Sequence, residues 1–195
     1  KVSIIAVAVA VFTAATQKKI HPDSGPGGPL VIAVLSDGYT AAEEAIFDQD
    51  AENFIKHSLL ADALYFQGKE AEFRIETFFD PLQAGKTSNY GFVVDAPNDC
   101  GLGDAPNTMS LMDAVVGGIN PKHIIIIGNH DYYLGCASGE WAYLAKGGVG
   151  TDVLLHEAGH MLAKLFDEFS LSHNVNTPYP GAIASTDRRN CSTNL

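Results

Sequence analysis

Two histidines four residues apart, with a glutamate beside the first, are the residues of this 195-residue chain best suited to chemistry. A helix would carry His156 and His160 one turn apart on one face, so both imidazoles could reach a single ion. Zinc accepts histidine nitrogens at roughly 2.0–2.1 Å, and catalytic zinc sites keep one position for water. Glu157 is turned aside from the first histidine and can take a proton from that water. The pattern predicts one zinc ion, with His156 and His160 as metal ligands and Glu157 as the catalytic general base.

A third zinc ligand has to come from the residues that follow this helix. Asp167 lies seven residues past His160, close to two full turns and therefore on the same face. In an unbroken helix it would lie about 10.5 Å further along the axis, so the chain must turn back for Asp167 to bind. Asp167 is favoured on facing and proximity, and the other candidates are Glu168, His173 and Asp187. The alternative role for the Asp-Glu pair is a solvated helix end or a hydrogen-bond partner of a ligand.

The composition limits the classes of partner. The formal net charge is −11, which argues against nucleic acid or an anionic membrane surface as the partner. Residues 1–20 begin with a lysine, continue with an apolar run and end in small residues, which is the layout of a secretory signal peptide. The alternative for this N-terminal apolar segment is a buried strand, and the run is too short for a transmembrane helix. We expect a secreted or periplasmic protein with no membrane attachment once the signal is removed.

The domain plan has a linker and one catalytic domain. Residues 21–29 contain three prolines and three glycines, which is typical of a linker. The globular domain is expected over residues 30–195 and as a monomer. Three cysteines do not define a disulfide framework, and Cys100–Cys136 is the pair we expect.

Strands and helices alternate along this domain, which predicts a mixed α/β (α+β) fold. Strands are expected at 30–35, 73–79, 90–95 and 122–129, with 73–79 half-buried because its apolar residues alternate. Helices are expected from the capping box of Thr40 and Glu43 to about residue 57–60, over 108–116, and around the histidine pair. Residues 98–107 are expected to form a loop. Residues 135–148 are expected to form a glycine-bracketed loop with a short edge strand at 141–145, where an extended substrate could pair.

Three stretches taken together resemble the IgA-peptidase family of zinc metallopeptidases, the igalysins. They are "VIAVLSDGYTAAEEAIFDQDAENFI", "IIIIGNHDYYLGCASG" and "LLHEAGHMLAKLFDEF". The residues that match the family's motifs are Asp37, Gly38, Tyr39, Thr40, Phe47 and Asp50 in the first stretch, and His156, Glu157, Gly159, His160, Leu165, Asp167 and Glu168 in the last. The likeness covers roughly residues 30–195. It implies a metzincin-like zincin domain with a mixed twisted sheet, a backing helix and an active-site helix. It also implies a secreted endopeptidase acting on protein or peptide substrates, with Asp167 as the third zinc ligand.

The chain departs from the family pattern at four places. Ala163 and Lys164 stand where the family tends to have glycine, and Phe169 replaces a tyrosine. Leu134-Gly135-Cys136 replaces a glycine pair, and no methionine follows Met161 to form a turn beneath the metal. The family continues beyond the point where this chain stops, so we expect the domain to be truncated at its C-terminus.

Two other classes of function compete with the peptidase. Residues 128–131, Gly-Asn-His-Asp after an apolar strand, are typical of calcineurin-like metallophosphoesterases. Such an enzyme holds two metals about 4 Å apart on ligands from several strand ends. Asp37 and residues 103–107 would have to supply the other pieces, and Tyr39 stands where a histidine is needed. The second alternative is a non-catalytic binding module on a zincin fold, which the missing methionine and glycines favour.

Overall fold

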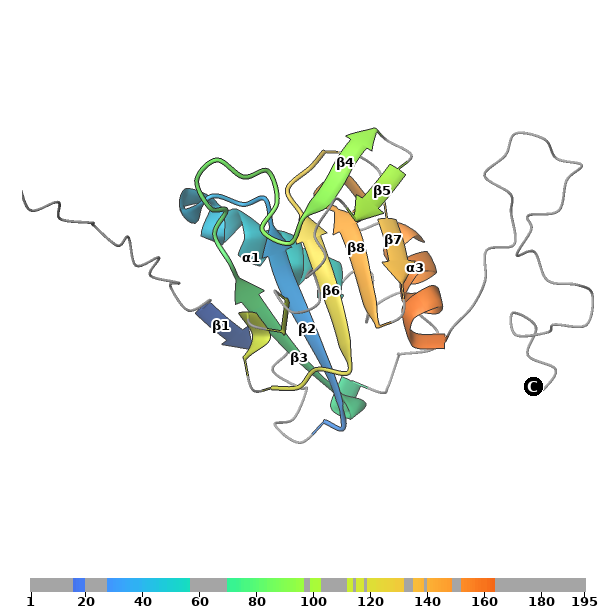
Figure 1. Cartoon of the computed structure of the whole chain (residues 1–195). Helices are drawn as coiled ribbons and strands as arrows, with labels where there is room; N and C mark the ends of the chain where they lie inside the picture. The colour runs from blue at the N-terminus through green and yellow to red at the C-terminus, as the bar shows by residue number, and fades with distance from the viewer. Residues whose placement is uncertain are drawn as a thin grey trace, which may run out of the picture.

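The fold was obtained as a computed structural model and is a mixed α/β arrangement around a six-stranded sheet (Figure 1). The residues that the structure describes are 16–19, 28–56, 70–96, 99–102, 112–113, 115–117, 119–131, 135–138, 140–148 and 152–163. In this part of the chain, no helix has both the length and the apolar character needed to cross a membrane.

Four parallel strands form the centre of the sheet, and an antiparallel strand lies at each edge. The order across the sheet is β1-β3-β2-β6-β8-β7. The strands are β1 (Thr16–Lys19), β2 (Leu30–Asp37), β3 (Phe73–Phe79), β6 (His123–Gly128), β7 (Gly135–Ser138) and β8 (Trp141–Ala145). Pairing is parallel from β3 through β2 and β6 to β8, whereas β1 and β7 run antiparallel to their neighbours. A separate two-stranded sheet contains β4 (Phe92–Ala96) and β5 (Asp99–Leu102).

Successive residues of the central strands point into two different hydrophobic clusters. In β2, Ile32 and Val34 belong to one cluster and Ala33 and Leu35 to the other. Since side chains alternate between the faces of a strand, both faces of the sheet are covered. A parallel strand covered on both faces has to be apolar throughout, which is why "LVIAVL" and "HIIIIG" form β2 and β6 as expected.

The helices cover the sheet unequally. The first face packs against α1 (Glu44–Phe54) and α3 (Asp152–Ala163), which contribute Phe47, Phe54 and Met161 to one cluster. The other face packs against Met112 and Val116, which lie in the described part of the helix expected over 108–116. The short 3-10 helices are η1 (Ala41–Glu43), η3 (Glu70–Glu72) and η4 (Lys146–Gly148).

The capping box between Thr40 and Glu43 is confirmed, because the backbone N–H of Thr40 donates to Oε2 of Glu43 at 2.7 Å. The helix that it starts begins as η1 and continues as α1 to Phe54. Residues 57–69, where its end was expected, lie outside the described residues.

Three expectations about strands were wrong. Residues 99–102 are not a loop but pair with β4 as β5. Strand β3 is buried on both faces, because Phe73, Ile75 and Phe79 pack into the first cluster and Phe78 packs into the second. Residues 141–145 do not form an edge strand, because β8 lies between β6 and β7 and every residue in it is buried. The edge strand on that side is β7, so the expected substrate pairing at 141–145 is wrong.

The N-terminal part of the chain is described only in places. Residues 16–19, at the end of the segment expected to be a signal peptide or N-terminal apolar segment, form β1 and pair with β3. Residues 1–15 and most of the 21–29 linker lie outside the described residues, as does everything after Ala163.

Gly128 at the end of β6 generates a stability prediction. A methyl group there would lie 1.8 Å from Oη of Tyr143, which is itself fully buried. Gly128→Ala should therefore lower the free energy of unfolding by about 1–3 kcal/mol through overpacking, measured by urea denaturation. In a Tyr143→Ala background the same substitution should cost far less, because the ring is gone. Equal costs in the two backgrounds would contradict this packing.

Candidate metal centre

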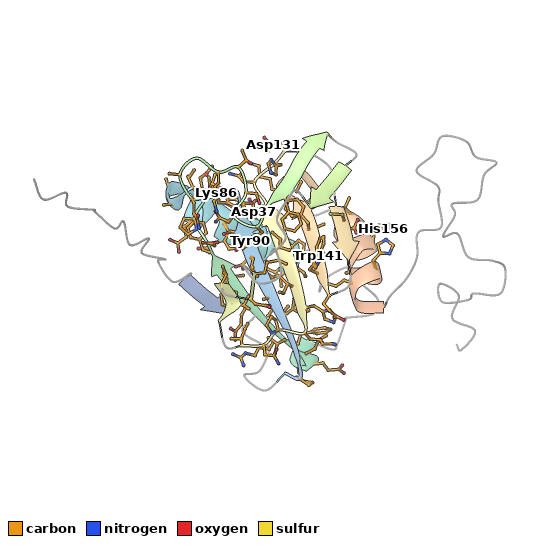
Figure 2. All side chains as sticks on the ribbon, viewed as in Figure 1. Asp37, Lys86, Tyr90, Asp131, Trp141 and His156 are labelled. Carbon is orange, nitrogen blue, oxygen red and sulfur yellow. The ribbon has the colours of Figure 1, made fainter. Side chains whose placement is uncertain are left out.

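The helix α3 presents different residues to the sheet and to the solvent. Ala158 and Met161, three residues apart, are buried, whereas His156 is exposed. Residues at this spacing share a helix face, so burying them against β7 and β8 turns His156 away from the sheet. Figure 2 shows His156 projecting from α3 on the side away from the strands.

The two histidines converge on one point. Nε2 of His156 lies 3.0 Å from Nε2 of His160, and the two rings are perpendicular with their centroids 4.5 Å apart. Two nitrogens bound to one tetrahedral zinc at 2.0–2.1 Å lie about 3.3 Å apart. The pair therefore fits a shared zinc ion with little adjustment. The same distance allows an N–H···N hydrogen bond between neutral imidazoles when no ion is held.

Glu157 occupies the interface between α3 and the edge strand. It is only 6% exposed, although the residue directly before it, His156, is exposed. Its side chain packs so closely on β7 that a methyl group at Gly135 would lie 2.7 Å from Cγ of Glu157. The side chain of Glu157 therefore packs toward the edge strand, whereas the preceding residue, His156, is exposed.

The candidates for the third zinc ligand lie beyond the part of the chain that the structure describes. Asp167, Glu168, His173 and Asp187 follow Ala163 and lie outside the described residues. Among the residues that are described, no group of three or more His, Cys, Asp or Glu side chains could hold a metal. The structure brings together two of the three predicted ligands.

The edge strand β7 is the part of the site that sequence reasoning missed. Its residues alternate: Ala137 packs with the cluster beneath α3, whereas Cys136 packs with the cluster on the opposite face. Cys136 is disulfide-bonded, and the pairing with Cys100 stays a prediction. The run of small residues in "GCAS" was the available signal, because a strand pressed against a helix needs short side chains.

Asp37, the first residue of the D-G-Y-T stretch, fastens a loop to the carboxyl end of β2. It is 1% exposed, and its carboxylate accepts hydrogen bonds of 2.7 Å from Oγ of Ser88 and from the backbone N–H of Asn89. Asn89 in turn donates to the carbonyl of Asp80 at 3.0 Å. Figure 2 shows Asp37 beside Tyr90 at this end of the sheet. These hydrogen bonds hold the loop at Ser88 and Asn89 to the end of β2.

The rest of that stretch ties β2 to α1. Oη of the buried Tyr39 donates to Oδ2 of Asp50 at 2.8 Å, and the ring packs edge-on against Phe47 with centroids 5.4 Å apart. Gly38 has a backbone φ of +78°, which residues with a side chain rarely adopt. A glycine at this position lets the chain turn from β2 into the helix. These contacts join the carboxyl end of β2 to α1.

The Gly-Asn-His-Asp segment after β6 also makes structural contacts. Asn129 donates to the carbonyl of Gly38 at 3.3 Å and to Oε1 of Glu43 at 3.2 Å. Asp131 forms an ion pair with Lys146 at 3.2 Å. Asn129 therefore joins the end of β6 to the end of β2 and to η1.

The comparisons with known proteins add no relative: the chain matches no protein-family model, and no curated protein matches it. The functional interpretation therefore depends on the motifs and on the geometry of α3 and β7.

Asp37 generates a prediction about pH. Burial raises its pKa from 3.8 to about 6, against the opposing effect of the hydrogen bonds from Ser88 and Asn89. Because the folded pKa is the higher one, this group stabilises the fold fully below pH 3.8, and that contribution is lost as the pH rises through about 6. One pKa unit corresponds to about 1.4 kcal/mol, so ionisation costs on the order of 2–3 kcal/mol.

Asp37→Asn cannot ionise and should reduce the loss of stability between pH 4 and pH 8 by that amount. Urea denaturation at both pH values measures the difference. The matched control is Asp131→Asn, which removes a carboxylate whose side chain is 91% exposed. A wild-type profile from Asp37→Asn would contradict the prediction.

Proposed function

We propose that the chain is a zinc-dependent endopeptidase domain of the metzincin type, resembling the igalysins. The observation that carries the proposal is the 3.0 Å approach of the two Nε2 atoms on a helix whose intervening glutamate is packed against an edge strand. Two convergent imidazoles with a neighbouring carboxylate are the elements of H-E-x-x-H hydrolysis.

The arrangement of the helices supports this proposal. The resemblance implies a mixed twisted sheet with a backing helix and an active-site helix, and α1 and α3 pack on the same face of such a sheet. A sheet of this kind occurs in proteins with many different functions. The position of α3 on the sheet is therefore the only part of the fold that supports an endopeptidase.

The chain's own residues have distinct roles in the proposed reaction. His156, His160 and Asp167 hold the zinc, which when bound lowers the pKa of its water and polarises the peptide carbonyl. Glu157 accepts a proton from the attacking water and returns it to the leaving amine. Its burial against β7 limits the side chain to few conformations, and proton transfer requires a carboxylate with a fixed position.

The edge strand β7 is the place where we expect a peptide substrate to bind. Among the described strands, β7 is hydrogen-bonded on one side only, to β8. An extended peptide could add to its outer edge through backbone hydrogen bonds, with side-chain pockets giving specificity. Because Gly135 touches Glu157, a peptide on this edge would pass close to the general base.

Secretion is part of the proposal and has two supports. The apolar N-terminal segment has the layout of a signal peptide, and the disulfide at Cys136 fits an oxidising compartment. The metallophosphoesterase alternative is weaker, because the carboxylate of Asp37 is enclosed and already accepts two hydrogen bonds.

Substitution of the general base tests the reaction. Glu157→Gln keeps the size of the side chain but removes the proton acceptor, so we expect unchanged zinc stoichiometry and a kcat lowered about 10²–10⁴-fold. Casein hydrolysis and elemental analysis measure the two quantities. Glu52→Gln, on the surface of α1, is the control and should behave as the wild type. Persistent turnover in Glu157→Gln would remove the general-base role.

Substitution of the third ligand tests the metal site. Asp167→Ala should weaken zinc binding by more than the roughly 10–100-fold typical of losing a residue that only supports a ligand. Competition with a chromogenic chelator measures the affinity. Glu168→Gln, His173→Ala and Asp187→Asn are compared in the same assay. If one of these three, and not Asp167→Ala, abolished tight binding, that residue would be the third ligand.

A further inference from the structure

We propose that Gly135 is a positioning residue for Glu157. The absence of a side chain at the start of β7 determines where the carboxylate of the general base lies. This inference rests on the proposed function, because it assigns a catalytic consequence to a packing contact. It adds to that function a residue on a different element, which the H-E-x-x-H pattern does not contain.

The contact at Gly135 leaves no room for a side chain. A methyl carbon there would lie 2.5 Å from Cγ1 of Val153, 2.7 Å from Cγ of Glu157 and 3.0 Å from Oε1 of Glu157. Carbon atoms that are not bonded to each other approach to roughly 3.5–4.0 Å at best. Any residue larger than glycine at this position must therefore displace something on α3.

The neighbouring contacts determine what would move. Strand β7 is held by its pairing with β8, in which Gly135 lies opposite Leu144. The helix is held by Ala158 and Met161, which are buried against the sheet. Two packed elements resist separation, whereas a glutamate side chain can change rotamer. The displaced groups are therefore the side chains of Val153 and Glu157. Val153 is branched at Cβ and has little rotamer freedom, so the longer glutamate side chain moves further and its carboxylate leaves the position that proton transfer requires.

The histidines should be far less affected. His156 is exposed on the outer side of α3, and its Nε2 lies 3.0 Å from Nε2 of His160. A methyl group at Gly135 consequently separates two properties that a general loss of folding would change together. Zinc binding stays, and the chemical step slows.

Kinetics on the full chain give the first test. We expect Gly135→Ala to bind zinc with an affinity within about threefold of the wild type and to lower kcat by about 10–100-fold, because a misplacement of about 1 Å costs up to about 10²-fold. KM should change much less than kcat. The control is Gly128→Ala, another overpacked glycine, whose methyl group meets Tyr143 and which should lose stability but keep kcat.

A thermodynamic cycle gives a second readout that does not depend on activity. Gly135→Ala should lower the urea midpoint of unfolding in the metal-free protein. In a Glu157→Ala background the Cγ and Oε1 atoms are gone and only the contact with Cγ1 of Val153 remains, so the same substitution should lower the midpoint by less than it does in the wild type. A cycle without coupling would show that the contact with Glu157 does not exist.

The outcomes separate the two proposals. If the wild type binds zinc and hydrolyses protein while Gly135→Ala keeps kcat within twofold, the positioning role is overturned and the endopeptidase stands. If the wild type takes up no zinc and shows no hydrolysis, the endopeptidase is overturned and the catalytic role of Gly135 with it. Slow turnover with intact zinc binding and a coupled cycle supports both.

Discussion

The packing of α3 on the last two strands of the sheet is the constraint on which the candidate site depends. A helix lying against a sheet must bury one stripe of side chains, and here Ala158 and Met161 belong to that stripe. The turn of the helix then fixes where every other residue points. His156 and His160 face outward and meet at their Nε2 atoms, whereas Glu157 falls at the boundary with β7. The different placement of the proposed zinc ligands and the proposed general base follows from the rotation of about 100° per residue.

The other motif residues serve the scaffold, and this explains why they occur together. Asp37 accepts hydrogen bonds from the loop at Ser88 and Asn89, and Tyr39 donates to Asp50 on α1. These bonds hold the carboxyl end of β2 to the elements on both sides of it. A stretch such as D-G-Y-T is therefore better explained by a strand end that must be capped than by direct participation in chemistry. The same holds for Asn129, which bridges the ends of β2 and β6.

The sequence predicted those features that a local pattern determines. Uninterrupted apolar runs identified β2 and β6, and the spacing of His156 and His160 predicted a shared helix face. Strand β8 was misjudged because "WAYLA" between glycines does not reveal which strands will flank it, and pairing partners are distant along the chain. The half-burial expected of β3 was wrong because Phe78 packs into the second cluster, whose other members come from elements distant along the chain. The contact between Gly135 and Glu157 joins residues on separate elements, so no local spacing could have indicated it.

The contact also shows why an H-E-x-x-H helix constrains its neighbour. With His156 and His160 on the outer face, Glu157 is rotated by about 100° from His156 and lies against β7. A glutamate at that position has a long side chain. It can pack against the strand here because the facing residue is a glycine and leaves room for it. Gly135 is that glycine on β7, and Ala137, two residues further along on the same face, shows that small side chains suffice once the glutamate is passed. The steric demand of the general base thus reaches beyond its own helix, and a glycine that forms no polar contact becomes part of the proposed catalytic geometry.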